Sequence, residues 1–135
     1  MYITIVGCGR LGSTLAENLS TAGYDIAIID RNAKNLEMLG SGFNGLRVKG
    51  VEFDNDILIE AGIKNTACLI AATPFDNINI TVALVAQKIF HVPRTIAKIN
   101  DPQKKHIYDS LGIETINPIE LSAYILKTRI EEKLK

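Results

Sequence analysis

An apolar run at residues 2–6 leads directly into the segment Gly-Cys-Gly-Arg-Leu-Gly at residues 7–12, and a second apolar run ends at Asp30. A buried strand, a Gly-x-Gly-x-x-Gly turn, a helix and an acidic strand end, in that order, are typical of the dinucleotide-binding βαβ unit. The first glycine permits a tight turn, the second leaves room for a phosphate, and the third lets the helix lie close to the strand. The pattern predicts a pyrophosphate site at the helix N-terminus.

Asp30 is the predicted ribose ligand, because it ends the second apolar run at about the 20-residue spacing that this motif requires. A carboxylate there accepts hydrogen bonds from the ribose hydroxyls and repels a 2′-phosphate. Arg31 follows it and partly offsets that repulsion, so NADP(H) stays open as a less favoured ligand than NAD(H). Two plainer alternatives remain, in which Asp30 only ends a strand or the turn has lost its ligand.

Strand and helix patterns alternate along the rest of the chain. The predicted strands cover residues 2–6, 25–30, 46–48, 67–72, 95–99 and 114–117. The predicted helices cover residues 11–22, 33–39, 54–61, 76–90 and 102–111, and residues 118 to the C-terminus, with Asp54 or Asn55 capping the third and Asp76 capping the fourth. We therefore predict one α/β domain over residues 1–135, a Rossmann-like doubly wound parallel sheet of six strands in the order 3-2-1-4-5-6 with helices on both faces.

This strand order places a ligand between strands one and four, above the carboxyl ends of the strands. The turn after strand four should then face the glycine turn, and the segment after strand three should border the adenine end. The candidate nucleotide-binding residues are Gly7, Cys8, Gly9, Arg10, Leu11, Gly12, Asp30, Arg31, Val51, Glu52, Thr73, Pro74 and Lys98.

Composition narrows the function further. The 15 basic and 15 acidic residues balance and Trp is absent, which argues against a nucleic-acid partner. The apolar runs are shorter than the roughly 20 residues of a membrane span, and Met1 leads straight into a strand, so we expect a cytoplasmic chain with no direct membrane insertion. Two cysteines form no disulfide framework, and isolated His91 and His106 predict no metal site.

An enzyme needs groups that hold a substrate and move a proton beside the cofactor. All six predicted strands already belong to the nucleotide fold. Tyr124 has Lys127 three residues on, which differs from the four-residue spacing of short-chain reductases, and no Gly-x-Ser-x-Gly elbow occurs. We predict binding without catalysis. The rival hypotheses are the cofactor domain of an NAD-dependent oxidoreductase and a nucleotide-free assembly domain.

Several further motifs occur together in one order. They are Ala61-Gly62-Ile63 before the fourth strand, Ala72-Thr73 with Asp76 and Asn79, Pro-Arg-Thr-Ile-Ala-Lys at residues 93–98, and Leu111-Gly112 leading to Asn117-Pro118. With the glycine turn, they make nearly the whole chain resemble the RCK domains, also called KTN or TrkA-N domains, which regulate potassium channels and transporters from the cytoplasm.

The resemblance implies that NAD(H), or ATP, ADP or AMP as alternatives, binds at the glycine turn and regulates a membrane potassium transporter or channel. It also implies a homodimer or a larger ring. Arg10 matches a family arginine that contacts the phosphates. Val51 departs from the pattern, because the family usually has Asp or Asn there, close to the adenine. The small C-terminal effector domain of many members is not expected within residues 1–135.

Three residue-level expectations complete the prediction. Cys8 is expected to be a small packed residue, with a low-pKa redox sensor as the alternative. The helix at residues 76–90 is apolar around most of its circumference, and the last helix carries an apolar stripe with further apolar residues beside it. These apolar surfaces predict that both helices contact another subunit, and ordinary burial within one domain is the alternative.

Overall fold

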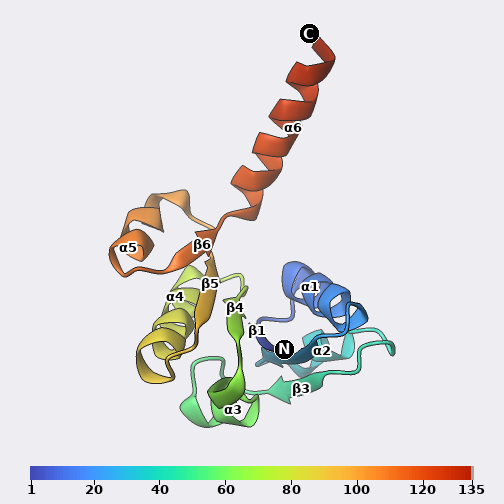
Figure 1. Cartoon of the computed structure of the whole chain (residues 1–135), viewed down its shortest axis with the longest axis vertical. Coiled ribbons are helices and arrows are strands. Elements are labelled where there is room, and N and C mark those ends of the chain that lie inside the picture. Colours follow the sequence, from blue (N-terminus) through green and yellow to red (C-terminus); the bar gives the residue numbers. More distant parts are fainter. Residues whose placement is uncertain (135) are drawn as a thin grey trace.

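The computed structural model describes residues 1–134 and contains a six-stranded parallel sheet in the order β3-β2-β1-β4-β5-β6, as predicted. The strands are β1 (Tyr2–Val6), β2 (Asp25–Asp30), β3 (Leu46–Lys49), β4 (Cys68–Ala71), β5 (Arg94–Lys98) and β6 (Glu114–Ile116). The helices are α1 (Arg10–Thr21), α2 (Ala33–Glu37), α3 (Asn55–Glu60), α4 (Asp76–Leu84), α5 (Lys105–Ser110) and α6 (Pro118–Leu134), joined by short helical turns at Ile63–Asn65 and Pro102–Lys104 (Figure 1).

The alternation of side chains along β1 and β2 divides the core between the two faces of the sheet. Ile3 and Ile5 of β1 pack with α1 and α2, in a cluster that includes Ala16 and Leu36. Val6 belongs to the cluster on the opposite face, which is built mainly with α3, α4 and α5. Because both faces are covered in this way, β1 and β2 are apolar at nearly every position.

Several element ends differ from the sequence prediction by one or two residues, and the helix predicted over residues 102–111 begins as a 3-10 turn at Pro102–Lys104. The helix predicted over residues 76–90 is α-helical only to Leu84 and continues as a π-helix over Val85–Ile89. Asp76 does not cap it, because the cap residue is Phe75 and the Asp76 carboxylate bonds to backbone beyond β5. The cap predicted at Asp54 is confirmed, since its side chain accepts a hydrogen bond from Asp56 N.

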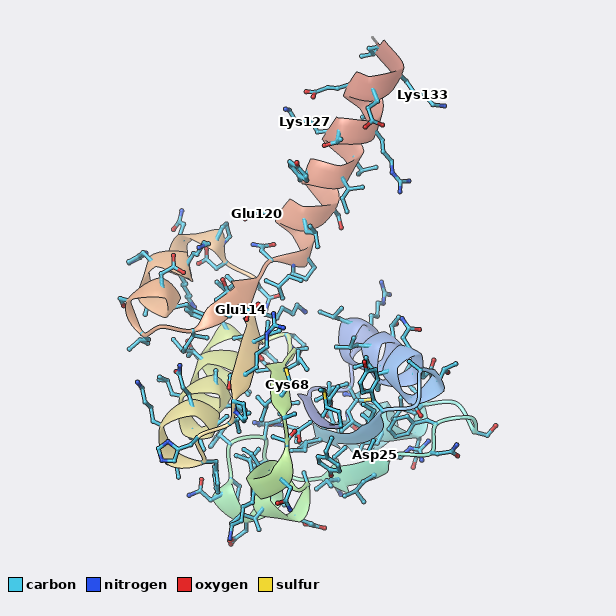
Figure 2. All side chains as sticks on the ribbon, in the orientation of Figure 1. Asp25, Cys68, Glu114, Glu120, Lys127 and Lys133 are labelled. Carbon is cyan, nitrogen blue, oxygen red and sulfur yellow. The ribbon has the colours of Figure 1, made fainter. Side chains whose placement is uncertain are left out.

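Helix α6 projects away from the sheet and its covering helices (Figure 1). None of its described residues is buried, and Figure 2 shows the side chains around Glu120, Lys127 and Lys133 standing clear of the remaining chain. Ordinary burial within this chain, one of the two predictions for α6, is therefore wrong. Within residues 1–134, no helix combines the length and the apolar character that crossing a membrane requires.

Candidate functional site

The glycine turn between β1 and α1 is held by close packing at its first and third glycines. Gly7 has φ of 102° and donates a 2.8 Å hydrogen bond to Ile29 O. A Cβ on Gly7 would lie 2.9 Å from Ala72 C, and a Cβ on Gly12 would overlap the carbonyl oxygen of Gly7. These two positions require glycine for the fold itself, because no side chain fits against the neighbouring backbone.

Gly9 is different, because a Cβ there would meet no atom of the described residues within 4 Å, apart from its own chain neighbours. Its backbone has φ of −87°, which every residue type tolerates, so neither packing nor conformation within the chain requires glycine. Gly9 is the N-cap of α1 and supplies no side-chain cap. The first N–H groups of a helix lack intrahelical acceptors, and the helix dipole favours an anion beside them. The open space at Gly9 therefore suits a phosphate, and Arg10 adds a positive charge in the first turn.

Asp30, at the carboxyl end of β2, is buried and tied to the glycine turn. Its Oδ2 accepts a 2.9 Å hydrogen bond from Cys8 N. Its Oδ1 accepts from Asn32 N at 2.8 Å and from Asn35 Nδ2 at 3.2 Å. Oδ1 thus accepts two bonds and Oδ2 one, which leaves acceptor capacity on Oδ2, and Asp30 lines a cavity. The same side chain fixes the turn and could accept a hydrogen bond from a ligand in that cavity.

Cys8 packs in the core between these groups, as predicted. It is 3% exposed, and its thiol donates to Asn35 O at 3.2 Å. Burial, with a smaller effect from Asp30, raises the pKa of Cys8 to about 11. The thiol therefore stays protonated at neutral pH, which contradicts the alternative of a low-pKa redox sensor.

Arg31 and Glu52 form a two-oxygen ion pair beside Asp30. Arg31 Nε donates to Glu52 Oε1 at 2.8 Å and to Oε2 at 2.9 Å. The Glu52 side chain is 4% exposed and that of Arg31 is 49% exposed. The hydrogen bond and charge of Glu52, with a smaller contribution from Asp30, raise the pKa of Arg31. The segment after β3 thus reaches the site through Glu52, while Val51 is 40% exposed.

Asn79 of α4 positions the loop of residues 73–75 opposite the glycine turn. It is fully buried, and its Oδ1 accepts from Thr73 N at 2.9 Å and from Thr73 Oγ1 at 2.7 Å. Its Nδ2 donates to Thr73 O at 2.9 Å and to Lys98 O at 3.0 Å. One amide therefore joins the ends of β4 and β5, and every bond that it can make is used.

Asp76 extends this bonding to the segment after β5. Its Oδ1 accepts from Asn100 N at 2.7 Å and its Oδ2 from Asp101 N at 2.9 Å. Tyr108 of α5 donates from its buried hydroxyl to Asp76 O at 2.8 Å. Burial, together with Asp76, raises the pKa of Tyr108 to about 12. The loops at the carboxyl ends of β4 and β5 are thereby held in one arrangement.

Two cavities open along this edge of the sheet and share Pro74. The first, of about 210 Å³, is lined by Asp30, Arg31, Asn32, Asn35, Glu52, Thr73, Pro74 and Phe75. The second, of about 430 Å³, is lined by Gly9, Arg10, Leu11, Ala72, Pro74, Lys98, Ile99, Asn100, Pro118 and Ile119.

Most of the predicted site residues lie together at these cavities. Gly7, Cys8 and Gly12 build the turn beneath them without lining either, and Val51 lines neither. Phe75 lies in the turn that was predicted to face the glycine turn. The lining residues that the sequence prediction missed are Asn32, Asn35, Ala72, Ile99, Asn100, Pro118 and Ile119. Asn100 follows the carboxyl end of β5, so the rule that led to Thr73 applied to it as well. Asn79 belongs to one of the motifs named in the sequence, but its positioning role was missed, because its partner Lys98 is 19 residues away.

The parallel sheet, with a glycine turn where its strand order reverses, defines a Rossmann-like domain. The model of the TrkA-N domain family matches residues 3–118, and the chain belongs to that family. A similar protein is "Trk system potassium uptake protein TrkA" of Streptomyces coelicolor, which is 43% identical over 123 residues. That match covers 91% of this chain and 55% of the Streptomyces protein, so the chain spans little more than half of that relative.

Solved structures share the fold. A Shewanella denitrificans Kef CTD in its AMP-bound form has a TM-score of 0.84 at 24% identity, covering 99% of this chain and 82% of that one. The GsuK channel bound to NAD has a TM-score of 0.81 at 24% identity, covering 98% of this chain and 23% of that one.

Proposed function

We propose that this chain is a nucleotide-sensing domain of a regulatory protein for potassium uptake or a potassium channel. The open space at Gly9 carries the proposal, because a glycine that the chain's own packing does not need is explained by a ligand that approaches its backbone. Asp30 supports it, since its buried carboxylate lies beside the turn with acceptor capacity left for a ribose.

NAD(H) is the proposed ligand, with AMP, ADP or ATP as alternatives. All of them present a ribose to Asp30 and phosphate to the helix N-terminus at Gly9 and Arg10. The second cavity favours the dinucleotide, because it offers room beyond the phosphates that a mononucleotide would leave empty. The structural neighbours whose titles name AMP and NAD are consistent with either class of ligand.

We propose that the domain binds its nucleotide without catalysis. Among the described residues, the side chains that line the two cavities include no His, Cys, Ser or Tyr. Of the acid–base groups that line the cavities, Asp30 and Glu52 are engaged in hydrogen bonds that fix the turn and Arg31, and Lys98 is the other one among the described residues. Steady consumption of NADH would instead support the oxidoreductase hypothesis.

The potassium link follows from family membership and from the Streptomyces relative, whose name places it in potassium uptake. On this basis we propose that the domain works in the cytoplasm, at the inner face of the membrane, and acts on a membrane potassium transporter or channel.

A second copy of the chain is the proposed partner of α6. Asn117 alone separates β6 from α6, and its Oδ1 accepts hydrogen bonds from Ile119 N and Glu120 N. This short capped connection fixes the direction of the helix away from its own sheet. The apolar side chains left exposed along α6 are Ile119, Leu121, Tyr124, Ile125, Leu126, Ile130 and Leu134.

The sheet offers an apolar surface of its own. Cys68, Ile70, Ile96 and Ile116 share the face that α1 and α2 cover over β1 to β3, and all four are only partly buried. Exposed apolar surface on both elements is what a homodimer or a ring would cover. A nucleotide regulates such an assembly only when it binds the alternative packings with different affinities.

The test is isothermal titration of the chain with NAD+, NADH, ATP, ADP and AMP in turn. Micromolar or tighter binding of one class, with no NADH consumed, supports a sensor and identifies its signal. A folded, oligomeric protein that binds none of the five would contradict the proposal and favour the nucleotide-free assembly domain.

A further inference from the structure

The ion pair between Arg31 and Glu52 lies where the ribose end of the site distinguishes nucleotides. In Rossmann-like domains an acidic residue after the second strand binds the free 2′-hydroxyl, whereas a nearby arginine accommodates a 2′-phosphate. This chain has both side chains in succession, Asp30 and then Arg31, and both line the first cavity. Asp30 and Arg31 by themselves therefore do not decide whether the site binds a ribose with a free 2′-hydroxyl or one with a 2′-phosphate.

Glu52 changes the availability of that arginine. Both of its carboxylate oxygens accept from Arg31 Nε, at 2.8 and 2.9 Å. The Glu52 side chain is 4% exposed, so water hardly reaches it. A 2′-phosphate that drew Arg31 Nε away would leave a buried carboxylate without its partner, which is strongly unfavourable. A 2′-phosphate that bound only the outer guanidinium N–H groups would meet a charge that Glu52 already neutralises.

The charges that line the cavity also disfavour a 2′-phosphate. Asp30 and Glu52 are two carboxylates in one cavity, and Arg31 is the single cation among the described residues that line it. A 2′-phosphate would add negative charge to a cavity with an excess of negative charge. A 2′-hydroxyl adds none, and it donates a hydrogen bond to Asp30.

We propose that Glu52 determines specificity by holding Arg31, so that the site accepts adenine nucleotides with a free ribose 2′-hydroxyl and rejects those phosphorylated there. This inference rests on the proposed nucleotide-binding function and narrows its ligand class. It also gives the segment after β3 a role that does not depend on Val51.

The experiment measures the affinity of the whole chain for two matched pairs, NAD+ with NADP+ and AMP with adenosine 2′,5′-bisphosphate. The wild-type chain should prefer the unphosphorylated member of each pair by about tenfold or more. In Glu52→Gln the carboxylate charge is lost while the shape is kept, so Arg31 becomes available to phosphate. The relative affinity for NADP+ over NAD+ should rise about tenfold, the scale of one charge-assisted hydrogen bond.

Two controls isolate the cause. Glu114 pairs with Arg94 through two oxygens at 3.1 and 3.0 Å, at the far edge of the sheet, and Glu114→Gln should leave both affinity ratios unchanged. Adding Arg31→Ala to Glu52→Gln should remove the gain. Glu52→Met, an apolar change of similar length, is a second test should Glu52→Gln fail to fold. It also removes the carboxylate that holds Arg31, so the ratio should shift in the same direction.

The outcomes distinguish a failure of the role proposed for Glu52 from a failure of the proposed nucleotide-binding function. Binding of NAD+ or AMP with an unchanged ratio in folded Glu52→Gln or Glu52→Met overturns the role of Glu52 and leaves the sensor intact. Equal wild-type affinity for NAD+ and NADP+ does the same. A wild-type chain that binds none of the four nucleotides overturns both.

Discussion

Cys8 N donates a 2.9 Å hydrogen bond to Asp30 Oδ2, which joins the glycine turn to the end of β2 across 22 residues of chain. The bond makes Asp30 part of the turn's structure as well as a candidate ribose ligand. Removing the carboxylate should therefore affect both stability and binding.

Asp30→Ala should lower the free energy of unfolding by about 1–3 kcal/mol, because it leaves buried N–H groups without acceptors. It should also weaken nucleotide binding by at least about tenfold. Chemical denaturation and calorimetric titration measure the two effects. Asp25→Ala, at the exposed opposite end of β2, is the matched control and should change neither. Nucleotide affinity that survives Asp30→Ala would contradict the ribose role.

Substitution by alanine should have different effects on stability at two glycines of the turn. Gly9→Ala should change the free energy of unfolding by no more than about 0.5 kcal/mol, because the new methyl group enters open space. It should nevertheless weaken nucleotide binding at least about tenfold, since the methyl group occupies the phosphate position. Gly12→Ala should cost at least about 3 kcal/mol, because its methyl group overlaps the Gly7 carbonyl. Thermal melts and titrations of both variants check this, and normal binding by Gly9→Ala would count against a phosphate there.

Asn79→Ala should lower the free energy of unfolding by about 3 kcal/mol, since it leaves Thr73 N and the carbonyls of Thr73 and Lys98 without partners. Released from Asn79, the loop of residues 73–75 should become mobile on the binding side of the sheet. Hydrogen exchange of Thr73 N measures that release. Asn77→Ala, an exposed change on the same helix, should alter neither quantity. Unchanged protection of Thr73 N would show that other contacts hold the loop.

Leu126→Asp or Ile130→Asp should shift the chain from oligomer to monomer. Both side chains are about three-fifths exposed, at 60% and 59%, so a charge there disturbs only a surface that a partner covers. Sedimentation equilibrium gives the mass of each variant. Lys133→Glu changes a charged residue of the same helix and should leave the mass unchanged. A wild-type chain that is monomeric at high concentration would rule out the proposed contact.

The Cys8 thiol predicts a specific dependence on pH. Its pKa in the folded chain is about 11, above the ordinary value of 9.0, so the folded state binds the proton more tightly than the unfolded state. The resulting stability is complete below about pH 9 and is lost as the pH rises toward 11. Tyr108, with a pKa of about 12 against 10.0, acts with the same sign at higher pH.

Denaturation of wild type and Cys8→Ala across pH 8–11 isolates the contribution of the thiol, because Tyr108 is common to both. The same pKa predicts that Cys8, studied in Cys68→Ala, reacts slowly with a thiol reagent at pH 8. Rapid modification in the folded protein below pH 8 would refute the raised pKa.

The sequence alone determined those features of the protein that depend on local patterns of apolar and glycine residues. Apolar runs separated by helical patterns fixed the sheet and its strand order, because parallel strands with helical crossovers allow few arrangements. The glycine spacing and Asp30 fixed the end of the sheet at which a ligand would bind. The sequence did not reveal the role of Asp76, because an acidic residue at the start of a helix is expected to be an ordinary N-cap.

Only the tertiary structure decided which partner each polar side chain takes. Asp76 bonds to the segment after β5, Glu52 holds Arg31 from the end of another strand, and Asn79 joins two loops. It also showed that α6 projects away from the sheet, although its sequence left burial within the domain open as an alternative to subunit contact. Local periodicity reports which face of an element is apolar, but the surface that it meets depends on how the whole chain is packed.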